Sequence, residues 1–139
     1  MSSLFRKSTP VLIVERIEPV LSFWKKLGIT PGVQVPDESA QDGRLAFAIL
    51  AAEGIEVMYQ TVVSITGDTV ASASDKTAFR MEPQQATLYI EVADLAQVQS
   101  QLEGERLVMP KRKTFYGASE LGYADPAGNI VIFSEHGES

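Results

Sequence analysis

The two halves of the sequence repeat one order of predicted strands and helix, and this repeat constrains the fold more than any other feature. In each half a short apolar run comes first, a helical pattern follows it, and three more strand-like runs complete the unit. Matching apolar positions are 78 residues apart early in the halves, as with Leu12 and Ile90. They are 76 residues apart at the last strands, as with Val57 and Phe133. The sequence therefore predicts an α+β fold of two tandem βαβββ modules.

The first module is predicted to span about residues 9–60. Its predicted elements are strands at 9–15, 29–36, 44–50 and 55–60 and a helix at 17–28. Pro19 suits the first turn of this helix, and Gly28 suits its end. Trp24 lies on the apolar stripe of the helix, so we expect it in the core, as we expect of Phe47.

The second module is predicted to span about residues 86–136. Its predicted elements are strands at 86–92, 105–111, 117–124 and 129–135 and a helix at 94–104. Asp94 is the expected N-cap and Gly104 the expected end of that helix. The sequence DPAGN at 125–129 is typical of a tight turn between the last two strands. The connector at 61–85, rich in Ser, Thr, Asp and Ala, is either a helix near 62–73 or a solvated linker.

The composition of the chain excludes several classes of function. With 139 residues, 45% of them apolar, the chain is expected to form a single domain over 1–139. It has no cysteine and one histidine, His136, which excludes disulfides, thiol nucleophiles and cysteine zinc sites. The net charge of −6 disfavours nucleic acid as a partner. We expect no membrane association and a cytoplasmic location, because no apolar stretch is long enough to span a bilayer and no signal-peptide pattern is present.

Three segments resemble one known superfamily. They are VLIVERIEPVLSFWKKLG at 11–28, IEVMYQT at 55–61 and LGYADPAGNIVIFSE at 121–135. They look like the opening strand and helix, the fourth strand and the final hairpin of the vicinal oxygen chelate superfamily, which includes glyoxalase I, extradiol dioxygenases and the fosfomycin and bleomycin resistance proteins. The resemblance implies a curved mixed sheet around a ligand cavity, with the helices on the convex face.

The same resemblance assigns the faces of two strands. Leu88, Ile90, Val92, Ile55, Val57 and Tyr59 would face the helices. Thr87, Tyr89, Glu91, Glu56, Met58 and Gln60 would face the cavity. Phe115 and Tyr116 lie on a segment similar to the ligand-covering loop of the superfamily and are further candidates for ligand contact. The basic run at 111–113 is either a solvated loop or an anion contact at the cavity mouth.

Metal-dependent members of this superfamily hold their ion on the first and fourth strand of each module. The matching positions here are Thr9, Glu56, Thr87 and Ile132. Only Glu56 is a good ligand for a divalent transition metal, so we expect no metal and no other cofactor. His136 is expected in an exposed tail, with a metal-binding or acid–base role as its alternative.

The resemblance implies a protein of the bleomycin-resistance type that binds and sequesters a small molecule, an antibiotic or a metabolite, without a catalytic metal. The acidic charge and Glu56 favour a cationic or polar aromatic ligand. One alternative is a metal-dependent lyase, isomerase or dioxygenase with an atypical ligand set. Another is a scaffold whose vestigial cavity is filled by side chains such as Tyr89 and Met58. The resemblance also implies a homodimer.

Overall fold

The computed structural model describes residues 4–69 and 82–137, which form two four-stranded mixed sheets and three helices. Sheet 1 has the order β1-β4-β3-β2. Its strands are β1 (Val11–Val14), β2 (Pro31–Pro36), β3 (Leu45–Ala52) and β4 (Ile55–Thr61). Only the β1–β4 pairing in this sheet is parallel.

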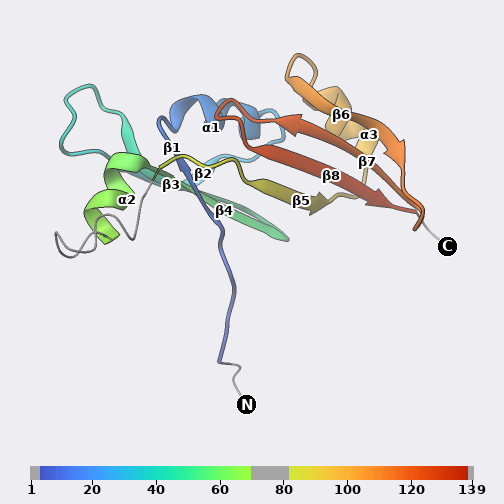
Figure 1. Ribbon diagram of the computed structural model, residues 1–139, viewed down its shortest axis with the longest axis horizontal. Coiled ribbons are helices and arrows are strands. Elements are labelled where there is room, and N and C mark those ends of the chain that lie inside the picture. Colours follow the sequence, from blue (N-terminus) through green and yellow to red (C-terminus); the bar gives the residue numbers. More distant parts are fainter. Residues whose placement is uncertain (1–3, 70–81, 138–139) are drawn as a thin grey trace.

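Sheet 2 repeats this arrangement in the second half, with the order β5-β8-β7-β6 and a parallel β5–β8 pairing. Its strands are β5 (Thr87–Glu91), β6 (Arg106–Lys113), β7 (Ala118–Ala124) and β8 (Ile130–His136). Helix α1 (Glu18–Lys25) follows β1, and helix α3 (Leu95–Gln101) follows β5. The structure therefore confirms an α+β fold of two βαβββ modules, which lie side by side with α1 and α3 on the same side of the sheets (Figure 1).

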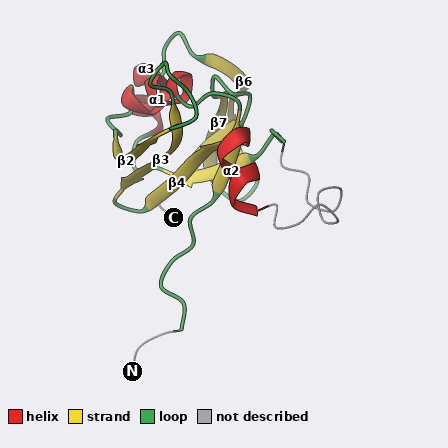
Figure 2. Ribbon diagram, turned by 90° about the vertical axis from the view of Figure 1, so that its left-hand side faces the viewer, coloured by secondary structure: helices red, strands yellow, loops and turns green. Residues whose placement is uncertain are grey.

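Local sequence explains the two module helices. In α1, Val20, Phe23 and Trp24 are buried at helical spacing, and Pro19 stands in the first turn. In α3, the Asp94 carboxylate accepts a hydrogen bond from the Gln97 backbone N–H at 3.1 Å, so the predicted N-cap is confirmed. The two helices lie next to each other in both views of the chain (Figures 1 and 2).

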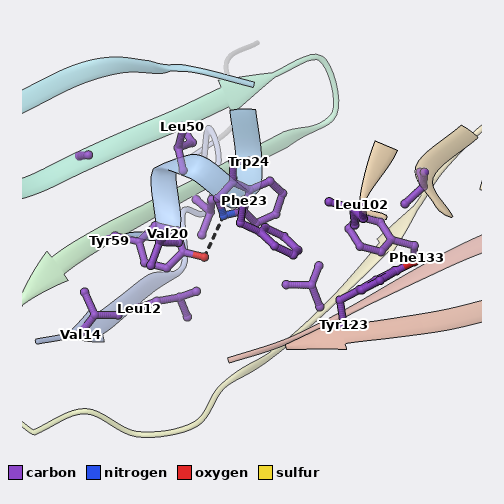
Figure 3. Packing of buried hydrophobic residues seen from close by; sticks show 14 of the residues in the cluster. Leu12, Val14, Val20, Phe23, Trp24, Leu50, Tyr59, Leu102, Tyr123 and Phe133 are labelled. Atoms are coloured by element: carbon purple, nitrogen blue, oxygen red, sulfur yellow. Dashed lines mark hydrogen bonds between the residues drawn. The ribbon is translucent and has the colours of Figure 1, made fainter. Parts of the chain in front are cut away.

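One hydrophobic core serves both modules. Its buried residues come from α1, α3 and the helix-facing positions of both sheets, and several of them are drawn in Figure 3. Trp24 and Tyr59 are fully buried, and Leu88, Ile90 and Val92 pack against the same cluster, as the strand alternation predicts. Because both modules contribute to this core, burial of apolar surface holds them against each other.

A buried hydrogen-bonded chain also joins the modules. Trp24 Nε1–H donates to the Tyr59 hydroxyl, and that hydroxyl donates to Asp125 Oδ2, both at 2.9 Å (Figure 3 shows the first bond). Asp125 begins the predicted DPAGN turn, and its Oδ1 accepts the backbone N–H groups of Ala127 and Asn129. Burial raises the pKa of Asp125 above the ordinary aspartate value, against the opposing effect of these hydrogen bonds.

The structure corrects two predictions made from the sequence, one about Phe47 and one about the basic run at 111–113. Phe47 is half-buried on the face opposite the core, because Ala48 and Leu50 occupy the core-facing positions of β3. The basic run at 111–113 is the end of β6 and not a loop.

The connector begins with a helix. Helix α2 occupies Val62–Thr69, which agrees with the helical alternative for this segment, while residues 70–81 lie outside the described residues. It packs on sheet 1 at the end away from sheet 2 (Figure 1). In the described part of the chain, no helix is long and apolar enough to cross a membrane.

Candidate functional site

Each sheet has one face against the shared core and one face turned away from it, which we call its open face. On the open face of sheet 2 lie Tyr89 from β5, Glu120 from β7, and Ile132 and Ser134 from β8. On the open face of sheet 1 lie Phe47, Glu56 and Met58, among others. The residues predicted to line one cavity are therefore divided between the open faces of two sheets.

A polar cluster on sheet 2 is organised around the Glu120 carboxylate, whose side chain is only 3% exposed. The hydroxyl groups of Tyr89 and Tyr116 both donate to its Oε2 at 2.7 Å, and Arg112 Nη2 lies 3.2 Å from its Oε1. The Tyr89 hydroxyl is also 2.8 Å from Ser134 Oγ. We call these five residues the Glu120 cluster, and it brings together Tyr89 and Tyr116, two of the predicted ligand contacts.

Hydrogen bonds shift the pKa values of two groups in the Glu120 cluster, Glu120 and Tyr116. Donation from Tyr116 and Tyr89, aided by Arg112, lowers the pKa of Glu120 below its usual value. The pKa of Tyr116 is raised to about 12 by its hydrogen bond with the Tyr89 hydroxyl, 3.4 Å away, and by its own hydrogen bond to Glu120. At neutral pH the carboxylate is thus ionised and the Tyr116 phenol is protonated, and the O–H groups of both tyrosines are directed to the carboxylate.

Aromatic rings stand exposed beside this carboxylate. Tyr89 is 50% and Tyr116 is 54% exposed, and Phe115 is entirely exposed. The rings of Phe115 and Tyr116 meet edge to face with centroids 5.1 Å apart, and the His136 ring lies 6.3 Å from that of Tyr116. Since the phenol protons are already donated, a ligand meets ring faces and oxygen lone pairs here, which suit a cation or a hydrogen-bond donor.

Glu56 on sheet 1 has a different environment. Its carboxylate accepts hydrogen bonds from Thr9 Oγ1 and from Lys7 Nζ, the latter at 2.8 Å. These two donors, Lys7 first, lower the pKa of Glu56. The structure thus brings Thr9 and Glu56 together, but Lys7 already neutralises the carboxylate.

The four positions that correspond to the metal ligands of the superfamily do not form a metal site. Thr9 and Glu56 adjoin on sheet 1, but in sheet 2 the residue beside Thr87 is Ile130, and Ile132 lies beside Tyr89. Two hydroxyls, an isoleucine and one carboxylate paired to a lysine are a poor donor set for a divalent transition metal. Over residues 4–69 and 82–137, no three His, Cys, Asp or Glu side chains gather in a group that could hold an ion.

The remaining residues predicted to line the cavity do not gather around a common point. Glu91, at the end of β5, has its Oε1 4.0 Å from His136 Nε2. Met58 is half-buried beside Val11 of β1. Gln60 is covered by α2, because its amide donates to Ser64 and Asp68 of that helix.

The sequence-based prediction of the site did not include Glu120 or Ser134, and it named Arg112 only as part of the basic run at 111–113, without its contact to Glu120. A signal for Glu120 existed, because Leu121 and Tyr123 alternate as core residues in β7 and place Glu120 on the opposite face. No comparable signal paired Arg112 with Glu120, since the β6–β7 pairing has two register irregularities between Leu107 and Arg112.

Comparison with known proteins supports the fold. No protein-family model matches the sequence, and no curated protein matches it significantly. Among solved structures, TioX from Micromonospora sp. ML1 is similar with a TM-score of 0.70 and 15% identity, over 94% of this chain and 99% of that one. A glyoxalase-related enzyme from Clostridium phytofermentans is similar with a TM-score of 0.68 and 12% identity, over 96% and 97%. A glyoxalase/bleomycin resistance protein/dioxygenase from Nocardioides is similar with a TM-score of 0.65 and 17% identity, over 99% and 88%.

These likenesses extend over nearly the whole chain at low identity, so what they establish is its architecture. The chain has the fold of these glyoxalase- and bleomycin-resistance-related proteins.

Proposed function

We propose that the chain binds a small organic cation with an aromatic part on the open face of sheet 2, and that it sequesters this ligand without transforming it. The observation that carries the proposal is the Glu120 cluster, where two tyrosines are held by one buried carboxylate beside an exposed phenylalanine. Fixed rings of this kind attract cations through their π faces and stack on flat ligands.

The electrostatics favour binding over proton transfer. A general base works best when its pKa is near the working pH, whereas the hydrogen bonds to Glu120 lower its pKa. Glu56 is likewise held ionised by Lys7 and Thr9. The residues at the four superfamily metal positions also do not fit an ion, and this supports a role without metal-assisted chemistry.

The alternative of a vestigial, self-filled cavity has less support. Tyr89 would have to plug the site, but half of its surface is exposed and its hydroxyl is directed to Glu120. The ring is therefore presented to solvent and remains available to a ligand.

We propose a homodimer as the state that binds. The open face of sheet 1 is largely apolar, and Val11 and Val33 on its strands are 42% and 43% exposed. A second copy laid on this face would remove these side chains from water, and exposed apolar surface of this kind commonly marks an interaction site.

A charge series tests the ligand proposal. Benzyltrimethylammonium, benzyl alcohol and benzoate share an aromatic ring and differ in charge. We expect thermal stabilisation by the cation to exceed that by the neutral alcohol and benzoate to have no effect, since only the cation gains from ring faces and carboxylate together. Tyr116→Ala should remove the stabilisation by the cation.

The control for Tyr116→Ala is Phe5→Ala, which removes another exposed aromatic from the N-terminal segment. It should leave the response unchanged. Equal stabilisation by all three compounds, or a response in Tyr116→Ala equal to that of the wild type, would contradict the proposal.

A further inference from the structure

A groove of about 460 Å³ runs between the two modules, away from the Glu120 cluster. Its walls come from the end of α1, from the β3–β4 turn, and from the end of β5 with the start of α3. This volume is within the range of small-molecule sites in proteins. The groove exists only because both modules contribute to it.

The walls of the groove are mainly aliphatic. Leu27, Ile29, Ile55 and Ile90 line it and are half-buried, so they retain surface that a ligand can cover. Trp24 also lines it but is fully buried, which places its ring beneath the wall surface. An alkyl chain therefore suits this groove better than the stacked aromatic ligand proposed for the open face.

The charged groups that line the groove are all negative. They are Glu53 in the β3–β4 turn, Glu91 at the end of β5 and Asp94 before α3. Within the described residues, no Lys or Arg lines the groove. Lys26, at the end of α1, is paired with Glu105. A groove with aliphatic walls and an acidic rim is complementary to a molecule with an alkyl tail and a cationic head.

We propose that this groove is a second binding site, and that it takes an amphiphilic organic cation, with the tail against the aliphatic walls and the head beside Glu53 and its acidic neighbours. The site is separate from that of the proposed function and does not depend on it.

Trp24 makes the site directly measurable, because it is the only tryptophan of the chain and it borders the groove. Octyltrimethylammonium, added below its micellar concentration, should produce a saturable change in Trp24 fluorescence. Octyl sulfate, with the same tail and the opposite charge, should produce none. Equal responses to the two amphiphiles would overturn the proposal, because they would show apolar adsorption without charge recognition.

Two variants test the walls and the rim. Ala52→Phe places a bulky ring in the groove from an exposed position in β3 and should abolish the response. Glu53→Gln should weaken binding about two- to fivefold, the range expected when one exposed ion pair is lost. Glu103→Gln removes another exposed carboxylate, one that does not line the groove, and should leave the affinity unchanged.

The results also separate this site from the open face. A response to octyltrimethylammonium that survives Ala52→Phe but is lost in Tyr116→Ala would overturn the groove and leave the open-face proposal standing. A response that is lost in Ala52→Phe and kept in Tyr116→Ala supports the groove, even if benzyltrimethylammonium fails to bind. An effect of Glu103→Gln as large as that of Glu53→Gln would overturn the role of the acidic rim.

Discussion

The Tyr59 hydroxyl joins the two modules at the scale of a single residue. It accepts from Trp24 of the first module and donates to Asp125 of the second, and all three side chains are buried. Removing the Tyr59 hydroxyl would leave the buried groups of Trp24 and Asp125 without their hydrogen-bond partner. A buried polar group without a partner keeps the full cost of its desolvation, and this cost exceeds the net contribution of an ordinary hydrogen bond.

Tyr59→Phe should therefore lower the free energy of unfolding by about 1–3 kcal/mol. The ring still fills the core, but Trp24 Nε1–H loses its acceptor and Asp125 Oδ2 loses its donor. Urea denaturation followed by fluorescence measures the change. Phe115→Leu, at an entirely exposed position, is the control and should stay within about 0.5 kcal/mol of the wild type. An unchanged midpoint in Tyr59→Phe would show that the chain of bonds does not stabilise the fold.

At the scale of elements, Glu120 connects β5, β6 and the segment before β7 through Tyr89, Arg112 and Tyr116. Because the pKa of Glu120 is lower in the folded chain than in the unfolded one, its contribution to stability is present above the ordinary glutamate pKa of 4.5. That contribution is lost as the pH falls through the lowered pKa of the folded state.

Glu120→Gln should accordingly make the fall in unfolding free energy below about pH 4.5 shallower than in the wild type. The measurement is urea denaturation at a series of pH values between about 3 and 7, on both sides of the ordinary glutamate pKa. Glu103→Gln, an exposed change of the same kind, is the control. If the Glu120→Gln slope matched that of the wild type, the cluster would not be formed in solution.

The order and type of the elements follow from local patterns, and for that reason they could be predicted from the sequence. The N-cap at Asp94 and the alternation in β5 depend on residues a few positions apart. The relations between strands are less predictable. The position of Ile132 beside Tyr89, and the arrival of Arg112 at Glu120, depend on parallel register and on irregularities in β6 that no local pattern encodes.

At the scale of the whole molecule, the two open faces differ in chemistry. Sheet 1 presents exposed valines, whereas sheet 2 presents a carboxylate with tyrosines. The first face suits a second copy of the chain and the second suits a small ligand.

The chain should accordingly sediment as a dimer, and Val33→Lys should shift it toward the monomer, because a lysine in an apolar interface costs desolvation. Analytical ultracentrifugation over a range of concentrations measures this. Pro36→Ala, at an exposed position of the same strand, is the control. A wild type that stays monomeric at every concentration would contradict the proposed dimer.

We propose above all that this glyoxalase-like fold carries a binding face for an aromatic cation. Amide chemical-shift mapping during a titration with benzyltrimethylammonium tests it most directly. We predict saturable shifts at residues of the open face of sheet 2, foremost Tyr89, Tyr116 and Glu120, that are the same with and without added divalent metal. Shifts that appear only when metal is present, and that centre on Thr9 and Glu56, would contradict the account.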